Sequence, residues 1–461
     1  MLKILKNLKQ SWLSVLVIIA LLCLQAATDL ELPNYTSKIV NDGIQAGGIE
    51  DSVPETITEE DMNSLLLFTT DDEFILNNYE LVDSEKYELK DISNSEREEL
   101  SNKMLDPIII FGTVQTEEIL KSLSEEQLSQ ILSESEKQID QMQETIKEQT
   151  AILYIKQIYT NAGVDLDDLQ MSYIFTTGLK MLGLAAVSMA SGITIMMLSS
   201  RVGAKMAKTL REKIFNKVLK FSTKELREFS TASLITRSTN DVQQIQQLLA
   251  MLFRTVVYAP IIGIGGIIKV MTESDSSMAW IIGLAVIVIL TVVATLFAVA
   301  MPKFKKLQSL IDKLNGVTRE ILTGKSVIRA FNTEEREEKR FDKANVDLMK
   351  ANIFVNRTMS IMMPALMLIM NGVSILIIWV GGHNVDQGVM QVGDMLAFIQ
   401  YSMQIVMSFL MISIISIMLP RASVSANRIV EVIETEPSIK DKETTKKLNP
   451  EKRGLDRKSV V

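Results

Sequence analysis

The chain has 461 residues, of which 47% are hydrophobic and 23% are charged, and its formal net charge is −8. A single cysteine and a single histidine exclude an internal disulfide framework, a cysteine-based zinc site and a histidine-rich metal cluster. The acidic balance, without aromatic residues interleaved among basic ones, disfavours nucleic acid as a partner.

The charge is distributed unevenly along the chain. Residues 50–168 contain 30 acidic and 8 basic side chains, a balance of −22, so the remaining residues sum to +14. Such an asymmetry within one chain indicates that the two parts face different compartments or different partners.

Six runs of nearly continuous apolar residues dominate the sequence. They cover residues 12–28, 173–200, 248–268, 278–301, 353–380 and 395–419. A helix needs about 20 residues to cross a bilayer, so the pattern predicts an all-α membrane protein with six transmembrane helices. The first run is longer than the apolar part of most signal peptides and lacks a cleavage motif, which favours a retained helix.

The segments between the apolar runs predict the orientation. The N-terminus and residues 201–247, 302–352 and 420–461 all carry an excess of Lys and Arg, which is typical of cytoplasmic segments. We therefore expect both termini to be cytoplasmic in a multi-pass plasma-membrane protein. By alternation, residues 45–168 lie outside, as an acidic and mostly helical extracytoplasmic insertion.

The soluble segments show a helical pattern. Residues 117–159 contain no Gly or Pro and predict one long amphipathic helix, whereas the first half of the insertion predicts irregular or mixed structure. Residues 202–221 and 307–349 predict helices that extend the transmembrane helices into the cytoplasm.

Four short stretches resemble the membrane domain of ATP-binding cassette (ABC) exporters. Residues 229–242 (FSTASLITRSTNDV) resemble the first intracellular loop of that family, and residues 315–331 resemble the second. Residues 29–44 and 421–429 resemble the outer end of its first helix and the exit of its sixth. The candidate coupling residues in the two loops are Ser233, Leu234, Arg237, Asn240, Asp241, Glu320, Gly324, Val327, Arg329, Ala330 and Phe331.

The resemblance covers residues 1–45 and 169–436 and implies the type I ABC exporter fold. It implies that two six-span half-transporters pair in the lipid bilayer, as a homodimer or heterodimer. The two loops are expected to form short transverse helices against nucleotide-binding domains, and Asn240–Asp241 is expected to cap a helix. The family's first outer loop is short, so the resemblance gives the insertion no role.

The resemblance also implies ATP and Mg as cofactors, bound by a nucleotide-binding domain. Gly324-Lys325-Ser326 looks like the end of a P-loop, but Arg319 stands where the first glycine is needed, and a helix is predicted where a strand should precede. No other P-loop occurs in the 461 residues. We divide the chain into four parts: residues 1–44 with the first helix, the insertion 45–168, helices two to six in 169–436, and a linker 437–461. The linker leads toward a missing ATPase domain, so we interpret the chain as a truncated gene fragment. A separate ATPase subunit is the alternative.

Methionines in the last span indicate a candidate substrate cavity. Its residues are Met403, Gln404, Met407, Ser408 and Met411, and the methionines repeat at helical spacing. Helix packing or lipid contact is the alternative. Asp29 and Glu31 are expected at the outer boundary, as solvated charges at a helix end.

The leading prediction for the function is the membrane domain of an ATP-driven exporter of apolar or amphipathic compounds. A receptor or sensor with an acidic ligand-binding ectodomain is the alternative. A channel or ion-coupled carrier would favour glycine-rich filters or paired intramembrane carboxylates, which the sequence does not show.

Overall fold

A computed structural model describes residues 11–69, 71–82, 85–114, 135, 137–139, 141–273 and 278–439. The chain divides into two compact units. Unit 1 comprises Met1–Leu21, Ile193–Val257 and Ile414–Val461, and unit 2 comprises Leu22–Gly192 and Tyr258–Ser413. Three of the long helices run from one unit into the other, so we describe the packing of each unit on its own.

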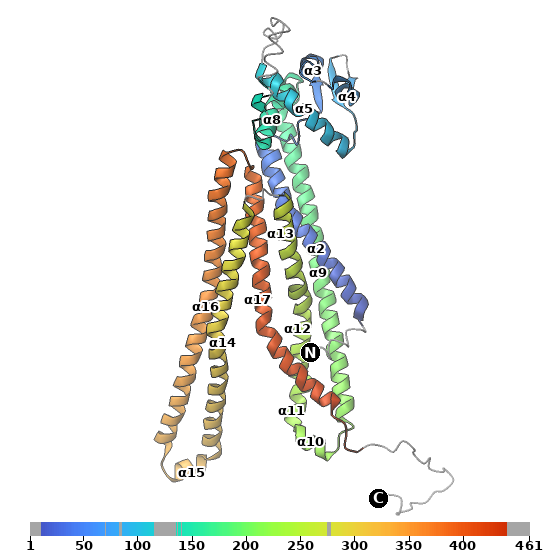
Figure 1. Ribbon diagram of the computed structural model, residues 1–461. Coiled ribbons are helices and arrows are strands. Elements are labelled where there is room, and N and C mark those ends of the chain that lie inside the picture. Colours follow the sequence, from blue (N-terminus) through green and yellow to red (C-terminus); the bar gives the residue numbers. More distant parts are fainter. Residues whose placement is uncertain are drawn as a thin grey trace, which may run out of the picture. The chain divides into compact units, whose positions relative to one another are not determined.

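Six helical segments of the described chain are long and apolar enough to cross a membrane, which confirms the predicted all-α fold (Figure 1). They are Trp12–Gln45, Leu166–Val218, Thr231–Thr272, Ala279–Thr323, Glu334–Asp386 and Val392–Ile412. The first is α2 (Trp12–Lys38) continued by the π-helical turn η2 (Ile39–Gln45); the second is α9 (Leu166–Val218). The third contains α11 (Thr231–Thr236), η3 (Arg237–Asp241), α12 (Val242–Met251), η4 (Leu252–Val257) and α13 (Tyr258–Glu273). The last three belong to α14 (Ala279–Thr323), α16 (Glu334–Asp386) and α17 (Val392–Glu434).

The first helix is longer than its apolar run predicts. The charged and proline residues after position 28 do not end it, because α2 passes through Asp29, Glu31 and Pro33. Both acids have partners inside unit 2, and the Glu31 carboxylate lies 2.6 Å from the Lys269 ammonium. The prediction of two solvated charges at a helix end is therefore wrong.

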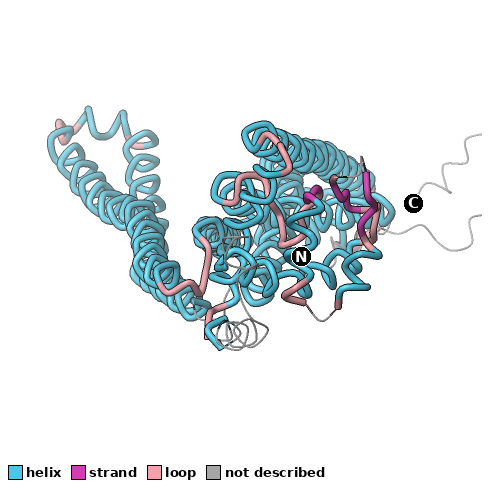
Figure 2. Tube along the Cα trace, turned by 90° about the horizontal axis from the view of Figure 1, so that it is seen from above, coloured by secondary structure: helices cyan, strands magenta, loops and turns pink. Residues whose placement is uncertain are grey.

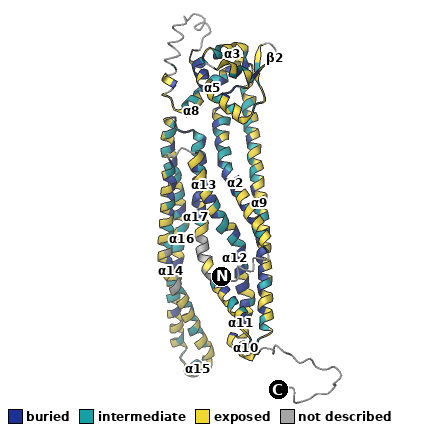
Figure 3. Cartoon of the chain, turned by 45° about the vertical axis from the view of Figure 1, so that its right-hand side comes forward, coloured by how far each residue is buried: buried dark blue, intermediate teal, exposed yellow. Residues whose placement is uncertain are grey.

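The insertion folds around a hydrophobic core of its own within unit 2. Its elements are β1 (Thr56–Thr58), α3 (Glu59–Leu66), α4 (Asp72–Asn77), β2 (Tyr79–Val82), β3 (Lys86–Leu89), α5 (Asn94–Val114) and α8 (Glu144–Asn161). The strands form an antiparallel sheet in the order β1-β3-β2, with Ile57 opposite Tyr87. Figure 3 shows both buried and exposed residues along α3, α5 and α8. The core includes Ile57, Met62, Leu65, Leu100, Met104, Ile108, Ile155 and Ile158.

The prediction of one helix over residues 117–159 is wrong in its second half. The backbone is not helical at residues 141–143, and α8 begins at Glu144 after an extended Gln143. This turn allows Ile139 and Ala151 to reach the same core, although twelve residues of straight helix would place them about 120° apart. Residues 115–134 lie outside the described part of the chain.

In the rest of unit 2, glycines of α13 allow the helices to approach closely. A Cβ atom at Gly263 would lie 2.6 Å from the Ser408 hydroxyl of α17, and one at Gly265 would lie 2.5 Å from a methyl group of Leu30 in α2. Small residues serve this purpose at many membrane-helix interfaces. The helices α14 and α16 pack side by side along their length (Figures 1 and 2).

Unit 1 gathers one hydrophobic cluster around its helix ends. Buried side chains come from α9, the short helices α10 (Thr223–Phe229) and α11, α12, and the last turns of α17. The cluster includes Leu210, Ile214, Phe229, Leu234, Val242, Ile245, Ala426 and Ile429. The first predicted loop is therefore part of a packed structure.

Candidate functional site

The first predicted coupling loop begins with a capped short helix. Ser222 and Glu225 form a capping box at the start of α10, in which the Glu225 carboxylate accepts hydrogen bonds of 2.6 Å from both the amide and the hydroxyl of Ser222. The amide of Ser438, just beyond α17, donates to the other Glu225 oxygen at 3.2 Å. Hydrogen bonds from the Ser222 and Ser438 side chains lower the pKa of Glu225 to about 2, so this carboxylate is ionised over the physiological range.

Arg237 ties this loop to α17. Its guanidinium donates to the Arg428 carbonyl and to the Glu431 carboxylate, each at 2.7 Å, and to the Ser233 hydroxyl at 3.2 Å. The same guanidinium lies 4.9 Å from the centre of the Phe229 ring. Arg237 is only 9% exposed, so it belongs to the framework of unit 1.

Asp241 does not cap a helix, which corrects the sequence prediction. Its backbone is already helical, and its side chain accepts no hydrogen bond from the following amides. The carboxylate instead accepts from the Ser425 hydroxyl at 2.8 Å and lies 3.6 Å from the Arg428 guanidinium. Because α17 uses this carboxylate, the chain passes through η3 without the predicted sharp entry.

The outward surface of the loop contains different residues from those buried in it. Leu234 is buried with Arg237 and Asp241, whereas Asn240 is exposed and Ser233 half-buried. The exposed apolar side chains are Leu226 of α10 and Ile235 of α11, which the motif comparison did not select. Leu226 stands between Glu225 and Arg227, a sequence signal that could have identified it, whereas Ile235 directly follows the buried Leu234 and has no such signal.

The second loop is a helical hairpin tip within unit 2. Here α14 ends at Thr323, the short helix α15 covers Lys325–Ala330, and α16 begins at Glu334. Asn332 has a positive φ of 52°, which turns the chain between the last two helices. A 2.6 Å ion pair joins Glu320 to Arg340 across the hairpin.

This geometry agrees with the rejection of Gly324-Lys325-Ser326 as a P-loop. The three residues lie between two helices, and the Gly324 amide donates to the Glu320 carbonyl at the end of α14. A phosphate-binding loop would connect a strand to a helix and present free amides.

The predicted residues of the second loop lie on its surface. No residue of α15 is buried; Val327 is 58% exposed, Phe331 is 76% exposed and the preceding Leu322 is 69% exposed. Arg329 and Ala330 are exposed as well, and Gly324 is half-buried. Beside them lies a groove of about 470 Å³, whose lining includes Thr318, Ile321, Leu322, Lys325, Ile328 and Phe341. The tip of this hairpin is therefore an apolar surface with a groove.

The predicted substrate-cavity residues of α17 differ in their exposure. Met403, Met407 and Met411 are exposed and follow one face. Ser408 is only 2% exposed and donates to the Ile405 carbonyl, and the Gln404 amide donates to the Asp29 carbonyl at 3.1 Å. The two polar residues therefore lie beside the methionine face, turned toward α2 and α13.

A polar cluster around Asp29 was missed as a site. The Ser188 hydroxyl of α9 donates to one carboxylate oxygen at 2.5 Å, and the Tyr258 hydroxyl of α13 donates to the other. With Gln404 of α17, four helices of unit 2 meet at this residue of α2. An acidic residue directly after an apolar run was the available signal, because intramembrane charges usually mark function.

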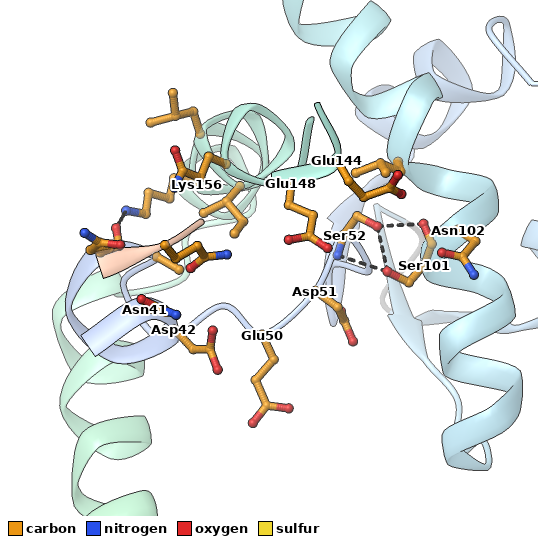
Figure 4. Close-up of a pocket in the computed structure, with 17 residues that line it drawn as sticks. Asn41, Asp42, Glu50, Asp51, Ser52, Ser101, Asn102, Glu144, Glu148 and Lys156 are labelled. Carbon is orange, nitrogen blue, oxygen red and sulfur yellow. Dashed lines mark hydrogen bonds between the residues drawn. The ribbon is translucent and has the colours of Figure 1, made fainter. Parts of the chain in front are cut away.

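An acidic pocket of about 500 Å³ lies where the insertion meets the ends of the long helices in unit 2 (Figure 4). Carboxylates line it from η2, the irregular segment that follows η2, and α8, and the hydroxyl groups of Ser52 and Ser101, which lie 2.8 Å apart, line it as well. They are Asp42, Glu50, Asp51, Glu144 and Glu148, with Lys156 as the basic residue. Desolvation, with repulsion from Glu144, raises the pKa of Glu148.

Comparison with known proteins identifies a family. The sequence pattern of the family described as ABC transporter transmembrane region matches residues 146–409. The match begins in α8 and ends in α17, so it takes in five of the six membrane-length segments.

Individual relatives agree with this match. An uncharacterised ABC transporter ATP-binding protein of Mycobacterium tuberculosis is 37% identical over 262 residues, which are 57% of this chain and 45% of that protein. A similar uncharacterised protein of Bacillus subtilis is 32% identical over 270 residues, 58% of this chain and 46% of that protein. A multidrug resistance ABC transporter ATP-binding and permease protein of Lactococcus lactis is 23% identical over 262 residues, 56% and 43% of the two chains. The chain thus spans a little less than half of each relative.

Proposed function

The chain belongs to the ABC transporter transmembrane region family and carries the membrane domain of an ABC exporter, and from this premise we propose how it works. It moves apolar or amphipathic compounds across the plasma membrane by alternating access, driven by a nucleotide-binding domain that binds ATP and Mg. It pairs with a second six-span half-transporter. Among the predicted alternatives, the family match favours transport over a receptor.

One observation carries the proposal, namely the exposed apolar tip of the α14–α16 hairpin. The apolar run of α14 ends near residue 301, and the 22 following helical residues extend it by about 33 Å. Leu322, Val327 and Phe331 are therefore exposed far beyond the hydrocarbon layer, where apolar surface favours a protein partner. A nucleotide-binding domain docking on α15 would cover these side chains.

The first loop suits transmission of a domain movement within unit 1. Because Arg237 and Asp241 bind α17 directly, a displacement of α10 and α11 is passed to the last membrane helix. Rigid-body movement of packed helices is the usual way in which such local displacements spread.

The proposed cargo class rests on the methionine face of α17. Flexible, polarisable thioethers adapt to apolar molecules of different shapes, and Met403, Met407 and Met411 present such a face. The name of the Lactococcus relative assigns multidrug resistance to that protein, which supports the same class here.

The test uses the complete transporter, with its nucleotide-binding domain, in proteoliposomes. We expect ATP-dependent accumulation of a fluorescent apolar dye, and we expect Phe331→Ser to lower the initial rate at least fivefold because it removes the proposed docking contact. Ser326→Ala on the same short helix is the matched control and should retain the rate. Wild-type rates from Phe331→Ser would contradict docking through α15, and absence of ATP-dependent accumulation would contradict the function.

A further inference from the structure

The cluster around Asp29 lies deep in the apolar spans of its partners. Ser188, Tyr258 and Gln404 are each about 9 to 12 residues from the nearer end of their apolar runs, which corresponds to about 13–18 Å along a helix. Since Asp29 contacts all three within unit 2, its carboxylate lies at the same depth. A carboxylate at this depth lies well inside the hydrocarbon layer.

The side chain of Asp29 has only uncharged hydrogen-bond partners. Its two oxygens accept from the hydroxyl groups of Ser188 and Tyr258. Two residues along the helix, Glu31 has the Lys269 ammonium as its partner. Within the part of the chain that the structure describes, Asp29 has only these neutral donors and no ion pair.

A second acceptor beside Asp29 also lacks a donor. The Gln404 amide nitrogen donates a hydrogen bond to the Asp29 carbonyl, whereas the Gln404 Oε1 atom is buried with no hydrogen-bond partner among the described residues. A buried acceptor without a donor is unfavourable, and so is an intramembrane charge without a counter-charge. One molecule that brings both positive charge and several N–H donors would satisfy both groups.

We propose, resting on the function proposed above, that Asp29 and Gln404 recognise the protonated amino group of amphipathic amine cargo. An ammonium group offers three donors and one positive charge, which match the Asp29 carboxylate and the Gln404 Oε1 atom. The exposed thioethers of Met403 and Met407, which flank Gln404 on α17, contact the apolar part of the cargo. Asp29 thus determines specificity for cationic over neutral compounds of the same shape.

Binding to the full chain in lipid nanodiscs tests this without nucleotide. The probes are dansylcadaverine, which is a primary amine, and its neutral N-acetyl derivative, and the measurement is a fluorescence titration. We expect the amine to bind more tightly than the neutral probe. Asp29→Asn should weaken amine binding roughly tenfold to a hundredfold, the range for a hydrogen bond to a charged group, and change neutral-probe binding less than about twofold.

Matched variants separate recognition from packing. Asp29→Glu should restore most of the amine preference, and Glu31→Gln, which removes a charge from the same helix, should leave the preference unchanged. Gln404→Met keeps the side-chain volume and should weaken amine binding several-fold. This variant provides the test if Asp29→Asn fails to fold. Equal weakening of both probes, or an amine preference that survives in Asp29→Asn, would overturn the inference. Selective amine binding without any ATP-driven transport would instead contradict the proposed function and leave this site standing.

Discussion

The two loops that resemble coupling loops use their characteristic residues in opposite ways. In the first loop, Arg237 and Asp241 are buried and hold α10–α12 against α17. In the second loop, Val327 and Phe331 are exposed, and the short helix α15 contributes nothing to a core. The comparison teaches that the first motif maintains the structure of its own unit, while the second is free to contact a partner.

The largest expected effect is on folding stability, from Arg237→Ala. This change removes hydrogen bonds to the Arg428 carbonyl and the Glu431 carboxylate from a nearly buried guanidinium. We expect a loss of about 2–4 kcal/mol, the range for breaking buried charged interactions. Thermal unfolding in detergent measures it, with Arg329→Ala of the second loop as the exposed control. Equal midpoints for the two variants would remove the distinction between the loops.

The second prediction concerns the second loop, where we expect a substitution to affect transport more than folding stability. Val327→Ser in α15 should change the free energy of unfolding by less than about 0.5 kcal/mol, as is usual for exposed positions. ATP-dependent dye transport by the complete transporter should still fall several-fold, because apolar docking surface is lost. A variant that is destabilised by more than about 1 kcal/mol would show instead that α15 packs within this chain.

A smaller effect is expected from the pH dependence of the α10 cap. The folded-state pKa of Glu225 is about 2, below its ordinary value of 4.5, because of the hydrogen bonds from Ser222 and Ser438. The stabilisation is therefore complete above about pH 4.5 and is lost as the pH falls toward 2. Hydrogen exchange of the α10 amides between pH 3 and pH 6 should follow this change in the wild type. Glu225→Gln should exchange faster throughout and lose the dependence, and a persisting dependence would point to another group.

The smallest effect is expected at the Glu320–Arg340 ion pair. Both side chains are about half exposed or more, so water and salt screen their attraction. Glu320→Gln should leave the unfolding midpoint within experimental error at 150 mM salt, measured beside Glu225→Gln. A clear decrease would show that the second loop depends on internal contacts as the first one does.

Much of the fold could be predicted from the sequence because hydrophobic runs of membrane length are a strong signal. The six spans, the helical extensions beyond the apolar runs and the separate insertion follow from that signal. The end of the first span could not be predicted, since Asp29 and Glu31 find partners on helices distant in sequence. The turn before α8 likewise depends on the core that Ile139 and Ala151 share.

The candidate site could be predicted only as a set of residues. The motifs selected Arg237, Asp241 and Phe331, but no motif states which side chain is buried and which is exposed. That difference arises from whether α17 packs against the loop, a contact between residues about 190 positions apart. Gln404 and Ser408 were assigned to the methionine face for a similar reason, because their buried partners on α2 and α13 are invisible in the local sequence.

The position of Ser438 has a consequence for assembly. Its hydroxyl lies 2.8 Å from that of Ser222, so the segment that leaves α17 returns to the start of α10 in unit 1. Any domain joined after this point would be attached to the chain close to α10 and α11. Such tethering raises the effective concentration of a partner to the millimolar range for a short flexible linker. Even a weak docking contact at the first loop would then stay occupied through repeated cycles of domain movement.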